Sequence, residues 1–155
     1  MTLKEYLRQV GESRLKCADL RQRIMDLNTR CQNITTKLCA APGGGGQNGP
    51  GDQLLALLAD ETARLAEALD RELRATAEVE AFIDTIQTPE PGKTILKRRY
   101  LRGDSISDVQ RWLTRTGCPY SRSQVYRLYA AAMRDADAAY RRRCALHTIQ
   151  EGTLR

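Results

Sequence analysis

An apolar stripe with heptad spacing runs through the first 38 residues of the chain. Its positions alternate steps of three and four residues, while basic residues such as Arg8, Arg14 and Arg21 fall outside it. Because an α-helix repeats every 3.6 residues, this spacing predicts one long amphipathic helix with a narrow, coiled-coil-like seam. We expect Cys17 and Cys31, which lie on the stripe, to be small buried hydrophobes rather than redox or metal-binding groups. The stripe consists of Leu3, Tyr6, Val10, Ser13, Cys17, Leu20, Ile24, Leu27, Cys31, Ile34 and Leu38.

A second heptad pattern occupies residues 52–87, where Asp52 is placed to cap a helix and Leu54, Leu73 and Phe82 widen the stripe. Between the two patterns, residues 41–51 hold six of the eleven glycines and two prolines, a composition typical of a flexible linker. We therefore expect residues 1–87 to form a long antiparallel helical hairpin of the coiled-coil type. The second stripe consists of Leu55, Leu58, Thr62, Leu65, Leu69, Glu72, Thr76, Val79, Ile83 and Ile86.

The formal net charge of +6 is unevenly distributed along the chain. Residues 1–40 carry +4, residues 41–92 carry −7 and residues 93–155 carry +9. The basic first helix and the acidic second helix attract one another, and the seam left exposed on a two-helix hairpin favours a homo-oligomer. The strongest positive charge belongs to the last segment, which favours an acidic partner for it.

A proline-rich break at residues 88–92 separates the hairpin from a predicted second domain at 93–146. A short helix over 93–101 ends at Arg-Gly-Asp, and Ser105 or Asp104 can cap a second helix that ends near residues 116–119. Ser121 can then cap a long helix that continues to about Ala145, with Val125, Leu128, Ala132 and Met133 facing inward, before a flexible tail at 147–155. The predicted fold is all-α, a helical hairpin followed by a helix-turn-helix domain.

A helix that enters the major groove reads base edges through arginine and amide side chains, and its N-terminus can bind phosphate. The first turns of the last helix carry the expected contacts, which are Ser121, Arg122, Ser123, Gln124, Tyr126 and Arg127. Lys97, Arg98, Arg99, Arg102 and Arg111 are expected to contact the DNA backbone. The cluster Arg141, Arg142 and Arg143 fits either a phosphate contact or an exposed, solubilising helix end.

The segments IleLeuLysArgArgTyrLeu, SerIleSerAspValGlnArgTrpLeu and SerArgSerGlnValTyrArgLeuTyr between residues 95 and 129 resemble region 4 of bacterial sigma factors. The closest resemblance is to small phage regulators that share this module, the ArpU-like late transcriptional activators. It covers residues 95–135 and implies promoter or phage DNA binding, transcription regulation and RNA polymerase as a candidate partner. The chain departs from this family between Leu113 and Ser121, where the turn is longer.

Two other functions remain open at this stage. One is a small terminase-like DNA-packaging subunit, which also combines a helix-turn-helix with an oligomerising coiled coil, and the other is a coiled-coil scaffold with a basic tail. A single histidine and the absence of a phosphate loop predict a protein that is not an enzyme and has no cofactor. Cys144 and His147 have ligand-like spacing, but without a second pair we expect no metal site. With no signal peptide and no apolar run of about 18 residues, we expect a cytoplasmic protein of a bacterial host cell, without membrane partners.

Overall fold

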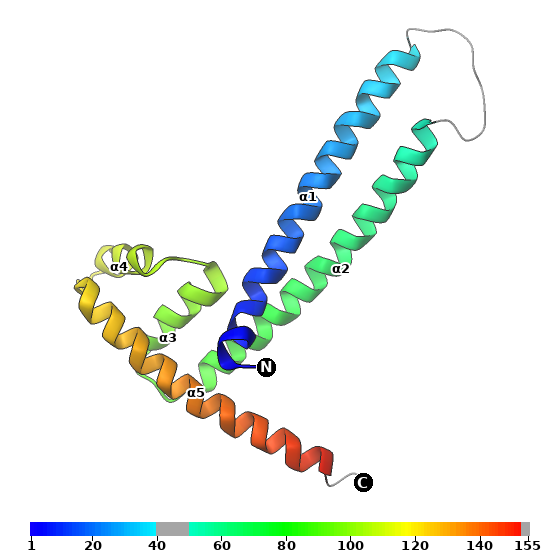
Figure 1. The fold of residues 1–155 in the computed structure, drawn as a ribbon. Helices are drawn as coiled ribbons and strands as arrows, with labels where there is room; N and C mark the ends of the chain where they lie inside the picture. Colours follow the sequence, from blue (N-terminus) through cyan, green and yellow to red (C-terminus); the bar gives the residue numbers. More distant parts are fainter. Residues whose placement is uncertain (40–49, 153–155) are drawn as a thin grey trace. The chain divides into compact units, whose positions relative to one another are not determined.

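The computed structural model describes the backbone of residues 1–39 and 50–152 and the side chains of 1–33 and 51–146. All regular structure in these residues is helical, which confirms the predicted all-α class (Figure 1). The predicted linker at 41–51 lies outside the described residues except for residues 50–51, which already belong to a helix. The elements are α1 (Leu3–Cys39), α2 (Pro50–Thr85), α3 (Glu90–Leu96), the π-helical turn η1 (Lys97–Arg102), α4 (Ile106–Arg115) and α5 (Arg122–Gly152).

The described residues group into two compact units. Unit 1 comprises Met1–Gly11 and Arg74–Arg155, and unit 2 comprises Glu12–Leu73. The start of α1 and the end of α2 therefore share a unit with α3, η1, α4 and α5. Over the residues described, no helix combines the length and apolar character needed to cross a membrane.

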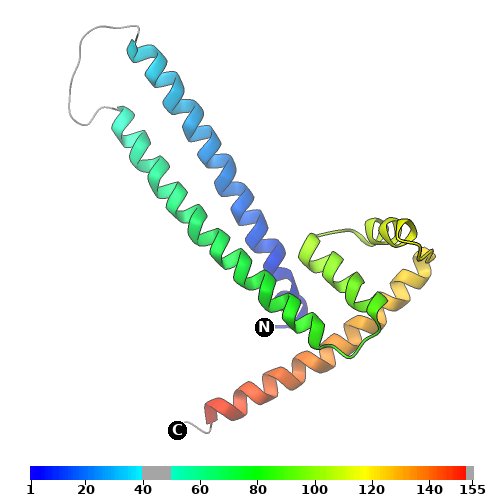
Figure 2. The same cartoon turned by 180° about the vertical axis from the view of Figure 1, so that it is seen from behind.

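In unit 2 the α1 and α2 segments lie side by side and run in opposite directions (Figures 1 and 2). Cys17 and Leu20 of α1 are buried in one cluster with Ala68 of α2, and Leu65 and Leu69 pack against that cluster. Burial raises the pKa of the Cys17 thiol, as expected for a cysteine that serves as a small core residue.

The seam of α1 is confirmed where its side chains are described, and the predicted seam of α2 is confirmed except at Leu55 and Thr62, which are exposed. Leu3, Tyr6, Val10, Cys17 and Leu20 are buried, and Leu7 adds to them. Ile34 and Leu38 lie outside the described side chains. On α2 the buried or half-buried positions are Gly51, Leu54, Leu58, Glu61, Leu65, Ala68, Leu69, Glu72, Ala75, Thr76, Val79, Phe82 and Ile83, and the buried Ile86 follows just after the helix. Leu55 and Leu73 are 57% and 69% exposed instead of lying in the core.

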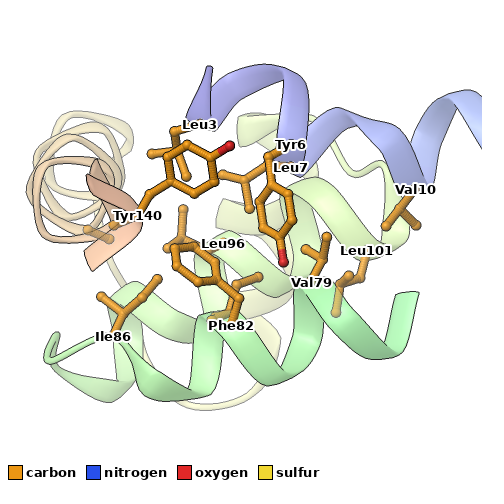
Figure 3. Packing of buried hydrophobic residues seen from close by; sticks show 13 residues of the cluster. Leu3, Tyr6, Leu7, Val10, Val79, Phe82, Ile86, Leu96, Leu101 and Tyr140 are labelled. Carbon is orange, nitrogen blue, oxygen red and sulfur yellow. The ribbon is translucent and has the colours of Figure 1, made fainter. Parts of the chain in front are cut away.

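The core of unit 1 gathers side chains from α1, α2, α3, η1 and α5 (Figure 3). Tyr6, Phe82 and Tyr140 form its aromatic centre, with the Tyr6 and Phe82 ring centroids 5.4 Å apart in an edge-to-face arrangement. The same cluster contains Leu3, Leu7, Val10, Val79, Ile83, Ile86, Leu96, Leu101, Ala132 and Ala136. Four of these buried residues come from the first ten positions of the chain, so the N-terminus is part of the core of unit 1.

The break before α3 is shorter than the proline pattern predicts. Residues 86–89 are non-helical, and α3 begins at Glu90 with Pro91 in its first turn. Proline is tolerated there because the first helical N–H groups have no intrahelical partner. Gly92 allows α3 to approach α5 closely, since a Cβ at this position would lie 3.1 Å from Cβ of Ala132. At the other end, α5 continues to Gly152, beyond the expected end near Ala145.

Candidate nucleic-acid interface

A small apolar cluster fixes α4 against the beginning of α5. Ile95, Val109, Leu113 and Val125 are buried together, each at 4% exposure or less. Trp112, Tyr120, Leu128 and Tyr129 pack around them, as does Ile106. The cluster holds the exposed side of α5 in a defined orientation, because three helices contribute to it.

Both ends of α4 are closed by local hydrogen bonds. At the N-terminus, Ser105 and Asp108 form a reciprocal capping box, which confirms the predicted cap at Ser105. At the C-terminus, the N–H of Cys118 donates to the carbonyl of Leu113 at 2.9 Å and that of Gly117 to Thr114 at 3.3 Å. This is a Schellman motif, and Gly117 has the positive φ of 84° that the motif requires.

The long turn between α4 and α5 is ordered by bonds to both helices. The Gln110 side chain donates from Nε2 to the Tyr120 carbonyl at 3.3 Å. Ser121 and Gln124 then cap α5 reciprocally, with the Ser121 N–H donating to Gln124 Oε1 at 2.8 Å and the Gln124 N–H to Ser121 Oγ at 3.3 Å. α4 thus continues through Arg115, and these hydrogen bonds hold the connection between it and α5.

Four polar side chains occupy the exposed face of the first two turns of α5. Arg122, Ser123, Tyr126 and Arg127 are all exposed, and the Arg122 guanidinium lies 5.8 Å from the centroid of the Tyr126 ring. From residue 109 to residue 134 the chain has five arginines and no carboxylate. This face therefore presents positive charge and hydrogen-bond donors without an acidic side chain on the same segment. Gln124 is also exposed, but its amide oxygen is occupied by the cap.

The basic residues around η1 differ in how they are held. The Lys97 ammonium lies 2.9 Å from a carboxylate oxygen of Asp84 and 3.3 Å from one of Glu80, and the bond to Asp84 raises the pKa of Lys97. The Arg99 guanidinium donates to the carbonyl of Asp104 at 2.9 Å. Arg102 is exposed and forms no ion pair with a described residue. Arg111 pairs with Asp108 within α4.

Arg98 is the most enclosed of these predicted backbone contacts. Its side chain is 15% exposed, lies 2.6 Å from the Asp104 carboxylate and covers the Trp112 ring. The contact joins Nη2 of Arg98 to Oδ2 of Asp104, and Oδ2 has no hydrogen-bond partner among the described residues, so the contact is an ion pair without hydrogen-bond alignment. Its charge is directed toward the protein, unlike that of the exposed Arg102.

Two arginines in the second half of α5 also form ion pairs with acidic residues. Arg143 donates to the Tyr6 hydroxyl at 2.7 Å and to the Glu78 carboxylate at 2.8 Å. Arg141 pairs with Asp137 at 2.7 Å, one turn earlier. The pair formed by Arg143 ties α5 to the start of α1 and the end of α2.

Sequence reasoning did not assign a function to Lys4 and Arg8. Both line a cleft with Arg99 and Tyr129, although the heptad pattern only places them on the outer side of a long helix. Nothing in the sequence pairs residue 8 with residue 129, because their proximity depends on how α1 packs in unit 1. Comparisons with protein-family models, curated proteins and solved structures find no match.

Proposed function

We propose that this protein is a sequence-specific, non-enzymatic DNA-binding regulator of transcription. In this proposal α3 with η1, α4 and α5 form a helix-turn-helix, and the first turns of α5 enter the major groove. The observation that carries it is the exposed, carboxylate-free face of Arg122, Ser123, Tyr126 and Arg127 on a helix fixed by the Val109, Leu113 and Val125 cluster. The resemblance to phage regulators supports the same function and gives RNA polymerase as a proposed partner.

The residues have different proposed roles. Arg122 and Arg127 can form bidentate hydrogen bonds to guanine, with Ser123 and Tyr126 beside them. Ser121 and Gln124 position this face by capping the helix, and the cap leaves the N–H groups of Arg122 and Ser123 to a phosphate. Arg99, Arg102 and Arg111 are proposed to contact the backbone, and Arg98 to position η1 against α4.

Selection of duplexes from a random-sequence pool, followed by titration of the selected duplex at about 100 mM salt, tests this function. We expect the intact chain to bind the selected duplex at least about 10³-fold more tightly than a scrambled one. The double variant Arg122→Ala/Arg127→Ala should lose most of this preference. The matched control Arg21→Ala/Arg30→Ala removes the same charge from exposed positions of unit 2 and should keep it. No enrichment, or equal losses in the two variants, would refute the proposal.

We also propose that the chain self-associates through α2. The side chains of Leu55, Ala59, Thr62, Ala66, Leu69 and Leu73 follow heptad spacing without a charge, and Leu55 and Leu73 are more than half exposed. A second copy fits this stripe because its basic α1 complements the acidic α2. Together with the antiparallel packing in unit 2, this supports a coiled-coil hairpin that oligomerises.

Sedimentation equilibrium tests this self-association. The variant Leu55→Gln/Leu73→Gln should weaken it at least about tenfold, a loss of about 1.4 kcal/mol. The control Leu146→Gln replaces an exposed apolar residue of α5 in unit 1 and should leave it unchanged. A monomeric wild type, or equal effects of the two variants, would contradict the proposed interface. A closed ring would favour the DNA-packaging alternative.

A further inference from the structure

A cleft of about 270 Å³ in unit 1 collects cationic side chains from three separate elements. Its volume lies just below the range for drug-sized ligands, about 300–1,000 Å³, but suits a single phosphate group. The lining includes three cations and two tyrosines, and no carboxylate. The lining residues are Lys4, Arg8, Gly11, Arg99, Tyr100, Gly103 and Tyr129.

Within the described residues, no ion pair neutralises the positive charge in the cleft. Lys4 and Arg8 lie one turn apart on the exposed side of α1, and neither forms an ion pair with a described residue. Arg99 donates one N–H to a backbone carbonyl, which leaves its charge uncompensated. Like charges at one cleft repel each other, so an anion bound between them stabilises the arrangement.

A pair of tyrosine hydroxyls supplies a further donor at the same place. The Tyr100 and Tyr129 hydroxyl oxygens lie 2.9 Å apart, and Tyr100 Oη is 3.6 Å from Sδ of Met133. Burial raises the pKa of Tyr100, so its hydroxyl remains protonated at neutral pH. When Tyr100 donates to Tyr129, the Tyr129 proton is available to an acceptor in the cleft. Cations combined with O–H donors are the groups that phosphate oxygens accept from.

The cleft lies beside the exposed face of α5. Positions 122, 126 and 129 fall on one side of a helix, so Tyr129 continues the line formed by Arg122 and Tyr126. A polyanion lying along Arg122 and Tyr126 reaches Lys4 and Arg8 one turn farther on. We infer that the cleft of Lys4, Arg8, Arg99 and Tyr129 binds a phosphate group of the DNA backbone. This inference rests on the proposed function.

The experiment measures DNA affinity of the intact chain as a function of salt concentration. Each phosphate contact contributes about 0.9 to the slope of log K against log salt. The double variant Lys4→Ala/Arg8→Ala should reduce the slope by about 1 on both the selected and the scrambled duplex. The ratio of the two affinities should stay unchanged, because phosphate contacts carry no sequence information. The control Lys16→Ala/Arg21→Ala removes two exposed charges from α1 in unit 2 and should not change the slope.

A neutral methylphosphonate, placed in turn at each linkage of the selected duplex, identifies the phosphate directly. At one linkage it should weaken wild-type binding but leave the binding of Arg8→Ala unchanged. If wild type binds DNA and the Lys4/Arg8 variant matches the control, the inference is overturned while the proposed function stands.

Titration with inorganic pyrophosphate tests the cleft in the case that the chain binds no DNA. If the chain binds no DNA, the proposed function fails, and with it the assignment of the phosphate to DNA. If pyrophosphate then binds to wild type but not to Arg8→Ala, the cleft is a phosphate site whose ligand is a free phosphate compound rather than DNA. No pyrophosphate binding would overturn the site itself.

Discussion

The guanidinium of Arg98 lies 4.4 Å from the centroid of the Trp112 ring and so connects η1 with α4. The same guanidinium is 2.6 Å from the Asp104 carboxylate, which is 22% exposed. A cation shielded from water between an aromatic face and a carboxylate is worth more to stability than a surface ion pair. Among the arginines of η1, Arg98 is therefore the one that fixes the arrangement of the helices.

Replacement of Arg98 by alanine should destabilise the fold. We expect a loss of about 1 to 3 kcal/mol in the free energy of unfolding, because the substitution leaves Asp104 without its partner and uncovers Trp112. Urea unfolding of the intact chain gives this value. Arg102→Ala, in the same turn but exposed, should change it by less than about 0.5 kcal/mol. Equal effects of the two substitutions would show that Arg98 is a surface charge.

Glycine-to-alanine substitutions should have opposite signs at two positions. Gly117→Ala should destabilise by about 1 to 2 kcal/mol, because its φ of 84° is strained for a residue with a Cβ. Gly11→Ala should stabilise by about 0.5 to 1 kcal/mol, since Gly11 lies in the interior of α1 and a Cβ there meets nothing within 4 Å. Thermal unfolding of both variants measures the difference. A stabilising Gly117→Ala would contradict the Schellman motif after α4.

Two leucines of α1 provide a test of how the N-terminus packs. Leu7 is fully buried in the core of unit 1, whereas Leu15 is 73% exposed. Leu7→Ala should cost about 2 to 5 kcal/mol of folding free energy, and Leu15→Ala less than about 0.5 kcal/mol. Both variants keep alanine's helix propensity, so denaturant titration compares burial alone. A small cost at Leu7 would mean that the first turns of α1 do not belong to the core.

On α2 the sequence periodicity alone does not determine which apolar residues are buried. Leu54 and Leu55 are adjacent, as are Phe82 and Ile83, so two apolar stripes overlap on this helix. Both stripes satisfy the heptad rule, and the packing of α1 buries Ala68, Phe82 and Ile83 but leaves Leu55 and Leu73 exposed. On α1 a single stripe exists over residues 13–31, and there the prediction and the structure agree.

The candidate interface likewise combines features that the local sequence predicts with features that depend on the folded structure. Local signals predict the caps at Ser105 and Ser121, because a serine three residues before an aspartate or glutamine bonds to nearby backbone. The roles of Arg98 and Arg143 depend on partners that folding brings near, such as Trp112 and Tyr6. Arg143 and Tyr6 are separated by 137 positions in the chain, so no local pattern relates them.

A panel of duplexes with single base-pair changes, titrated with wild type and Arg122→Ala, tests the central claim most directly. Wild type should discriminate against changes at each contacted position by about 1 to 3 kcal/mol. Arg122→Ala should lose discrimination at one or two adjacent base pairs and keep it at the others, because Arg122 reads a base edge there. A uniform loss of affinity for every duplex would contradict the account, since it would make Arg122 a backbone contact only.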